Sequence, residues 1–210
     1  MKRVTIILGL LMLLLPIAAW ADGIDLTNRS GTITYTTAGV ASTGSQLISF
    51  GGITAPKGSA LGSVSFTTGA FTGSSLWQNG TFSSTGSTFD IMGQGKWLAS
   101  VLGSPAKGKV ALFTGSFVGP ISWTLVSAVH ASYVFDLSGT ISGTLWTGQH
   151  VTGTTTQTIY SFTDQWPTDH KGVIHAGNSQ MAVPEPGTLS LFGTGLLTLA
   201  GTMRRKFLRS

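Results

Sequence analysis

The sequence has no cysteine and few charged residues, and both features limit the kinds of active site that the protein can form. Without cysteine among its 210 residues, the chain can form neither a disulfide scaffold nor a catalytic thiolate. Charged residues make up only 9% of the sequence, and residues 22–183 contain no glutamate. A glycosidase needs two carboxyl groups flanking one bond, yet the aspartates here are scattered. Alternation with apolar neighbours predicts that Asp90 and Asp136 face solvent.

The net charge of +5 comes from the two ends of the chain and not from its middle. The basic residues of segment 22–183 are Arg29, Lys57, Lys96, Lys107, Lys109 and Lys171, and its acidic residues are Asp22, Asp25, Asp90, Asp136, Asp164 and Asp169. Six positive minus six negative charges leave a net charge of zero. A segment without excess positive charge has no electrostatic basis for binding phosphate backbones. Nucleic acid is therefore excluded as a partner.

Patterns typical of metal, cofactor or nucleophile sites are also missing from the sequence. The four histidines, His130, His150, His170 and His175, lack the short spacing of metal-binding pairs. The one local cluster joins Asp169 and His170 to His175. No Gly-x-Ser-x-Gly segment marks a serine as a nucleophile. We therefore expect a non-enzymatic protein with no catalytic residue, no metal and no cofactor.

The segment 22–163 predicts an all-β domain. Runs with period-two alternation recur at roughly ten-residue spacing between glycine-rich turns, which is typical of short strands. The expected strands include residues 32–36, 46–53, 63–67, 89–92, 109–117, 121–129, 132–137, 140–146 and 154–162. Asn79-Gly80 predicts a two-residue hairpin between Leu76-Trp77 and Thr81-Phe82. Residues 97–102 predict one helical turn.

This strand pattern favours an antiparallel β-sandwich or jelly roll. Aromatic-Thr-Gly-Ser units recur loosely at residues 71–74 and 113–116, so a β-solenoid is the alternative. Residues 164–182 lose the alternation and predict a linker after the domain.

The N-terminal residues have the layout of a secretory signal peptide. Lys2 and Arg3 precede an apolar run over residues 4–19, and Ala19 and Ala21 form a small-x-small cleavage site. Signal peptidase is the expected partner, and the first 21 residues are excluded from the domain. An uncleaved N-terminal anchor is the alternative.

The last 28 residues, 183–210, contain three parts in a fixed order. A short stiff motif, 183–186, precedes an uncharged apolar run, 187–203, and a basic cluster at 204–209 that contains Arg204, Arg205 and Lys206. As a helix the run would span roughly 25 Å, at the short end for a hydrocarbon core of about 30 Å. The basic cluster would remain cytoplasmic. The sequence thus predicts a single C-terminal transmembrane helix, with a buried core helix as the alternative.

This tail resembles the PEP-CTERM protein-sorting signal of Gram-negative bacteria, from Pro184-Glu185-Pro186 to the closing Arg204-Arg205-Lys206. The resemblance covers about an eighth of the chain. It implies recognition by an exosortase, a membrane-embedded cysteine transpeptidase, with Pro184, Glu185 and Pro186 as recognition residues in a substrate. It also implies transient anchoring in the inner membrane through residues 187–203, processing near the motif, and transfer to the cell surface or extracellular matrix.

The tryptophans are the remaining candidates for ligand contact. Trp123 alternates in phase with its apolar neighbours, which predicts a core position. Trp77, Trp97 and Trp166 lie near turns, where an exposed ring could stack on a sugar. We therefore expect a structural or adhesive surface protein. The alternative is a module that binds extracellular polysaccharide through these three side chains.

Overall fold

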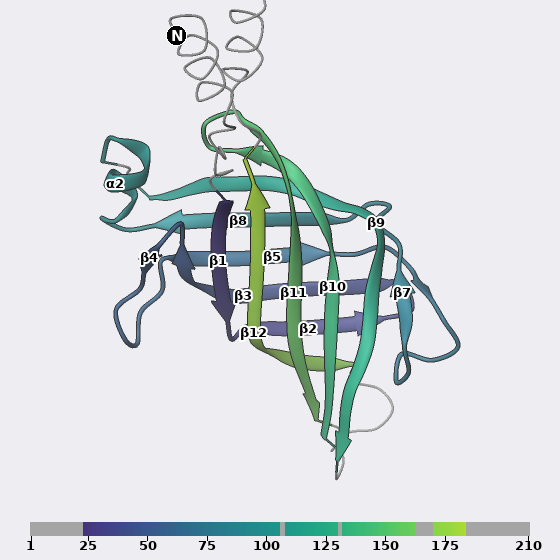
Figure 1. Cartoon of the computed structure of the whole chain (residues 1–210). Coiled ribbons are helices and arrows are strands. Elements are labelled where there is room, and N and C mark those ends of the chain that lie inside the picture. Colours follow the sequence, from purple (N-terminus) through teal and green to yellow (C-terminus); the bar gives the residue numbers. More distant parts are fainter. Residues whose placement is uncertain (1–22, 106–107, 130–131, 163–169, 184–210) are drawn as a thin grey trace, which may run out of the picture. The chain divides into compact units, whose positions relative to one another are not determined.

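The computed structural model describes residues 23–105, 108–129, 132–162 and 170–183, which are almost entirely strands (Figure 1). The elements are β1 Gly23–Arg29, β2 Thr32–Thr36, β3 Gly39–Phe50, β4 Ile53–Thr54, β5 Gly62–Thr67, β6 Phe71–Thr72, β7 Gly80–Phe82, β8 Thr88–Gln94, α2 Leu98–Leu102, β9 Lys109–Val129, β10 Ser132–Leu145, β11 His150–Phe162 and β12 Lys171–Ala182. The all-β prediction is confirmed, and α2 is the predicted helical turn.

Eight strands form one closed antiparallel sheet. Their order is β10-β11-β12-β1-β3-β5-β8-β9, and β9 pairs with β10 to complete the ring. The short strands β2, β4, β6 and β7 extend this sheet. The predicted sandwich or jelly roll is not confirmed, because the strands belong to one continuous barrel. The solenoid alternative is not confirmed either, since every pairing among the described strands is antiparallel.

The barrel is flattened into two layers whose strands cross, which can be followed in Figure 1. Strands β1, β12, β11 and β10 run across β3, β5 and β8. Residues 23–36 pass from one layer to the other as a bent strand, because both β1 and β2 pair with β3 and β12. The bend lies at Ser30 and Gly31, which have φ of 60° and 95°.

Strand β9 makes the second passage between the layers. It pairs with β8 over its first residues and with β10 along most of its length. The sequence predicted two strands here, 109–117 and 121–129, separated by Gly119 and Pro120. The structure has one strand that bends at this point, where Gly119 adopts a φ of 75°, a left-handed conformation that glycine tolerates.

The predicted linker 164–182 is wrong for residues 171–182. They form β12, which pairs with β11 on one side and with β1 on the other. Its inward positions include Gly172, Gly177 and Ser179, so the apolar alternation that identifies a strand is absent. Residues 163–169 lie outside the described residues.

One side of the barrel interior is lined by phenylalanines. Phe66, Phe89, Phe113 and Phe117 come from β5, β8 and β9, and we call this group the phenylalanine wall. The Phe66 and Phe89 rings stack with centroids 6.0 Å apart, and Phe89 meets Phe117 edge to face at 5.7 Å. Such ring pairs add to the stabilisation that burial of their apolar area provides.

The other side of the interior holds a buried hydrogen-bonded cluster, which we call the polar seam: Asn28, Ser45, Thr155, Gln157 and Ser179. The Asn28 amide donates to Ser45 Oγ and to Gln157 Oε1, both at 2.8 Å. Gln157 Nε2 donates to Asn28 Oδ1 at 3.2 Å and to Thr155 Oγ1 at 3.0 Å. Ser179 Oγ donates to Thr155 Oγ1 at 2.7 Å. The seam links β1, β3, β11 and β12, and both amides have all their N–H groups paired.

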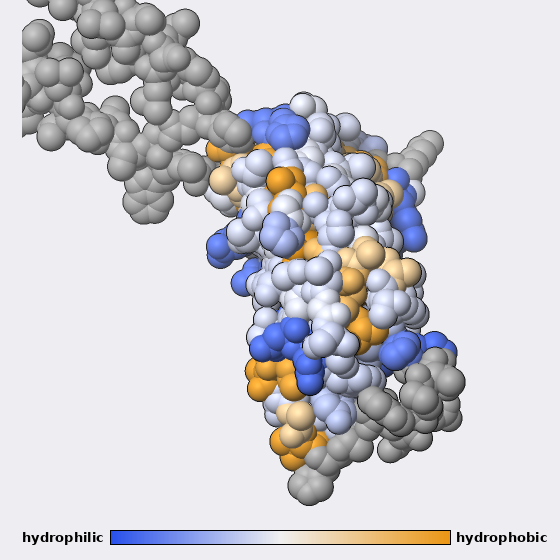
Figure 2. All heavy atoms as spheres, turned by 90° about the vertical axis from the view of Figure 1, so that its right-hand side faces the viewer, coloured by the Kyte–Doolittle hydropathy of each residue, from blue (hydrophilic) through white to orange (hydrophobic). Residues whose placement is uncertain are grey.

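The outer face carries mainly small hydroxyl side chains, and most of the surface in Figure 2 is correspondingly pale. On β11 the exposed positions Thr152, Thr154 and Thr156 alternate with inward residues. Asp90 and Asp136 lie on this outer face, as predicted, while their neighbours Phe89 and Phe135 are buried. Asp136 accepts a hydrogen bond from Thr158 at 2.7 Å.

The signal-peptide and anchor predictions, residues 1–21 and 187–203, fall outside the described residues. In the part of the chain that the structure describes, no helix has the length and apolar character needed to cross a membrane.

Candidate functional site

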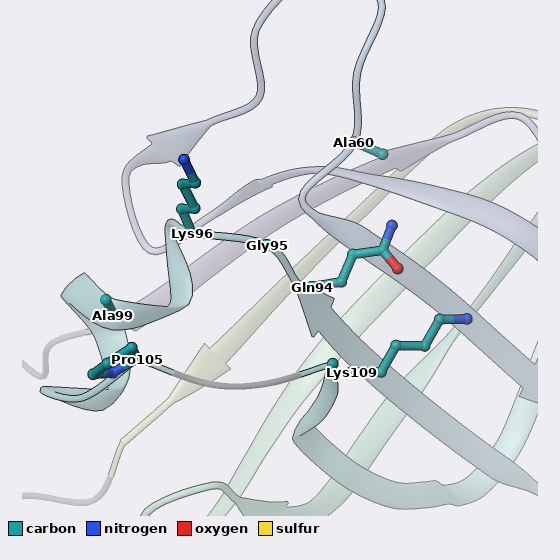
Figure 3. Close-up of a pocket in the computed structure, with 8 residues that line it drawn as sticks. Ala60, Gln94, Gly95, Lys96, Ala99, Pro105 and Lys109 are labelled. Carbon is teal, nitrogen blue, oxygen red and sulfur yellow. The ribbon is translucent and has the colours of Figure 1, made fainter.

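A hollow of about 750 Å³ lies beside α2, at the end of the barrel where β8 ends and β9 begins (Figure 3). It is lined by Ala60, Gln94, Gly95, Lys96, Ala99, Pro105, Gly108 and Lys109. The lining contains two lysines and one glutamine but no acidic side chain. It is therefore a concave surface of positive charge on a segment whose total net charge is zero.

The two strands place the polar side chains of the hollow next to each other. Gln94 and Lys109 are direct cross-strand partners at the ends of β8 and β9. Figure 3 shows both side chains extending to the same side, with Lys96 on the loop before α2. An amide beside an ammonium group can donate several hydrogen bonds to an anionic or hydroxylated ligand. Because Gln94 and Lys109 are far apart in the sequence, sequence reasoning did not find this arrangement.

Trp97 holds the helix that forms one wall of the hollow. Its indole Nε1 donates to the carbonyl oxygens of Leu61 at 2.8 Å and Gln94 at 2.7 Å. Its ring packs on Phe50 with centroids 6.1 Å apart. The helix that follows buries Leu98 and ends at Gly103, which has a φ of 70°. Trp97 is thus half-buried and engaged with the domain through both its ring and its N–H.

The other predicted sugar contacts lie elsewhere. Trp77 is half-buried, packing against Tyr133 with centroids 4.9 Å apart and against Tyr35 at 6.0 Å. Trp166 lies outside the described residues. The structure does not bring Trp77 and Trp97 together, and their role in sugar contact stays a prediction. Trp123 is fully buried, which confirms its predicted core position.

The histidines are dispersed over the surface. His150 contacts Ser142 Oγ at 3.5 Å, and His175 stacks on Tyr160 with centroids 4.5 Å apart. His170 packs beside Tyr35, and His130 lies outside the described residues. Among the described histidines and acidic residues, none form a group of three or more that could hold a metal ion.

Tyr35 carries a buried hydroxyl that is hydrogen-bonded to a serine. The Tyr35 hydroxyl lies 2.5 Å from Ser161 Oγ, and Ser161 Oγ lies 3.1 Å from the Lys171 carbonyl oxygen. Burial raises the pKa of Tyr35 above its ordinary value of 10.0, and the hydrogen bond with Ser161 partly offsets this rise. The hydroxyl is therefore neutral and structural near pH 7.

Comparison with known proteins locates one functional segment. The family described as the PEP-CTERM protein-sorting motif matches residues 182–206, which confirms the resemblance noted in the tail. The match covers a small part of the chain and overlaps the barrel only at Ala182, the last residue of β12. No curated protein and no solved structure matches the chain.

The sorting motif implies the class of this protein: an exported protein that an exosortase sorts. It also implies passage across a membrane in a Gram-negative bacterium. The motif residues Pro184, Glu185 and Pro186, the basic residues Arg204, Arg205 and Lys206, and the cleavage-site residues Ala19 and Ala21 lie outside the described residues.

Proposed function

We propose that this protein is a non-enzymatic structural or adhesive component of the cell surface or extracellular matrix. The observation that carries the proposal is a sorting motif attached to a closed barrel whose interior is filled by its own side chains. A filled barrel of mostly neutral, hydroxyl-rich surface suits a building unit better than a reaction chamber. On this proposal signal peptidase removes residues 1–21, and exosortase processes the chain near residues 184–186.

Intact mass and fractionation test the delivery part of this proposal. We expect the protein in the medium and outer envelope to lack residues 1–21 and to end near Pro184–Pro186 only when the exosortase gene is present. A full tail retained in the inner membrane under both conditions would overturn it.

Matrix cohesion tests the role after delivery. Loss of the gene is expected to weaken the matrix, and the unchanged chain is expected to restore it. A chain with Pro184, Glu185 and Pro186 all changed to Ala is the matched control, since the barrel is intact but sorting fails. Unchanged cohesion in the deletion strain would contradict a structural role.

The second candidate function is polysaccharide binding, and the cationic hollow favours an acidic polysaccharide. Lys96 and Lys109 face no acidic side chain within its lining, so a carboxylate- or phosphate-bearing sugar would meet uncompensated positive charge. Attraction between exposed charges weakens as salt rises. Binding at this hollow should therefore weaken with ionic strength, whereas stacking on exposed tryptophan rings should not.

Retention of the protein on the host's own exopolysaccharide distinguishes binding at the cationic hollow from stacking on tryptophan rings. In the hollow version, Lys96→Gln with Lys109→Gln abolishes retention, and Arg29→Gln on the outer face of β1 leaves it unchanged. In the stacking version Trp77→Ala or Trp97→Ala reduces retention at all salt concentrations. No retention of the unmodified protein on any fraction of the polysaccharide would end the binding hypothesis.

A further inference from the structure

The first and last strands of the barrel are neighbours, and their outer ends meet. Gly23 pairs with Ala182 and Ile24 with Met181 across β1 and β12. On its other side Ala182 pairs with Thr152 of β11. Met181 is fully buried, and Val183 packs against the core. The sheet therefore continues to Ala182, two residues before Pro184.

This pairing leaves no spacer between the folded barrel and the residues that exosortase must recognise. Pro184 directly follows Val183, and the apolar run begins at residue 187. Four residues in a fully extended chain span at most about 14 Å. Processing enzymes act on segments whose backbone is free of other structure, yet the backbone up to Ala182 is held between β1 and β11.

We propose that release of residues 180–183 from the barrel gates the processing of the sorting motif. Residues 180–182 pair with β1 and β11, and Val183 packs against the core. The inference rests on the processing step of the proposed function. During export β1 emerges first and β12 last, and β12 fills the place between β1 and β11. Closure of the sheet and engagement by exosortase thus compete for the same four residues.

The polar seam sets how far this end can open. Inward of residue 180, Ser179 donates to Thr155 within the buried hydrogen-bonded cluster. Opening beyond this point would expose or unpair buried polar groups, which is costly. Strand ends open locally far more readily than the centre of a sheet. The gate therefore comprises residues 180–183, and the rest of the barrel stays closed during processing.

Two changes to the full chain test the gate in a host that carries the exosortase. The first inserts ten flexible Gly and Ser residues between Val183 and Pro184. The second is Thr152→Cys with Ala182→Cys, an exposed cross-strand pair that can form a disulfide in the exported compartment. Because the chain has no cysteine of its own, no other disulfide can form within it. Pulse-chase labelling with intact mass measures the rate of tail removal.

The spacer is expected to raise the rate and the disulfide to lower it. Gain or loss of one net hydrogen bond changes the fraction of chains with residues 180–183 released by about fivefold. The rate of cleavage follows this fraction when opening and closing are fast compared with cleavage. We therefore expect changes of about fivefold or more in opposite directions. A membrane-permeant reductant should restore the rate of the locked chain. With spacer and disulfide combined, the rate should equal that of the spacer variant alone.

Matched controls separate the gate from general effects. Thr140→Cys with Thr154→Cys joins β10 to β11 at exposed positions, and the same insertion after Gly86 lengthens a loop; neither should change the rate. Tail removal that depends on exosortase but stays within about twofold of the unmodified rate in both the spacer variant and the disulfide variant would contradict the gate. The proposed function would then still stand. If the unmodified chain keeps its tail with exosortase present, the processing step fails and the gate with it.

Discussion

The polar seam and the phenylalanine wall occupy the two sides of the same barrel interior but hold it together differently. The wall is made of large rings on β5, β8 and β9, and its contacts depend on shape and area. The seam is made of amides and hydroxyls on β1, β3, β11 and β12, and its contacts depend on direction. Apolar packing tolerates small shifts, whereas a buried amide pair is satisfied in one register only.

The polar seam and the phenylalanine wall therefore have different roles in the fold. The seam lies where the first and last strands of the domain meet, so it specifies how the ring closes. The wall contributes buried apolar area that makes closure favourable. Four predictions test this difference, from the largest expected effect to the smallest.

Truncation in the wall should cost the most stability. Phe89 is fully buried and contacts Phe66, Phe113 and Phe117. Phe89→Ala should lower the free energy of unfolding by about 3–5 kcal/mol, measured by urea denaturation of the purified protein. Val118→Ala, at an exposed apolar position of β9, is the control and should change it by about 0.5 kcal/mol or less.

Breaking the seam should lower the free energy of unfolding less than truncation in the wall does. The effects of the Asn28 and Gln157 substitutions should, however, be strongly coupled. Asn28→Ala or Gln157→Ala leaves the partner amide with unpaired buried groups, at about 1–3 kcal/mol each. The double variant should be less destabilised than the sum of the two, by about 1 kcal/mol. Urea denaturation of all four proteins gives the coupling. Strict additivity would show that the two amides do not act as a unit.

Tyr35 combines both kinds of contact and adds a pH dependence. Tyr35→Phe should lose about 1 kcal/mol at pH 7, because the hydroxyl bond to Ser161 is removed. The pKa of Tyr35 is raised above 10.0 in the folded protein, so its stabilising contribution is complete below pH 10 and is lost as pH rises further. The stability gap between the two proteins should therefore narrow above pH 10. Thermal unfolding measured from pH 7 to 11 checks this; a constant gap would contradict it.

The smallest effect is expected at two serines of β3 that differ in pairing. Ser42 is buried and its Oγ has no hydrogen-bond partner within the described chain, whereas Ser45 Oγ accepts from Asn28. Ser42→Ala should raise stability by up to about 1 kcal/mol, and Ser45→Ala should lower it by about 1 kcal/mol. Equal shifts of the denaturation midpoint in the same direction would contradict this contrast.

The wall was predictable from sequence, and the seam was not. Around Phe66, Phe89 and Trp123, apolar residues alternate with polar ones, so both the strands and their inward faces were predicted correctly. On β12 the inward residues Gly172, Gly177 and Ser179 leave only Ile174 and Met181 as buried apolar positions. The apolar pattern was therefore too sparse to identify the strand, which was taken for a linker. A strand whose buried face is partly polar can be recognised only once its partners are known.

Long-range pairing accounts for the other differences. Asn79 predicted a two-residue hairpin, but residues 73–79 form a longer turn, and the Asn79 side chain accepts from the Leu125 backbone N–H at 2.8 Å. The cationic hollow depends on the pairing of Gln94 with Lys109, which no local pattern encodes. The sorting motif, in contrast, was recognised from the sequence because its three parts are contiguous.

Closure of the sheet has a further consequence for an exported protein. An unpaired strand edge is a template for joining another chain, and such edges promote aggregation. In this barrel each of the eight long strands has a neighbour on both sides, and strands at the margin, such as β4 and β6, contain two residues each. The described part of the domain therefore offers little unpaired backbone through which a second copy could extend the sheet.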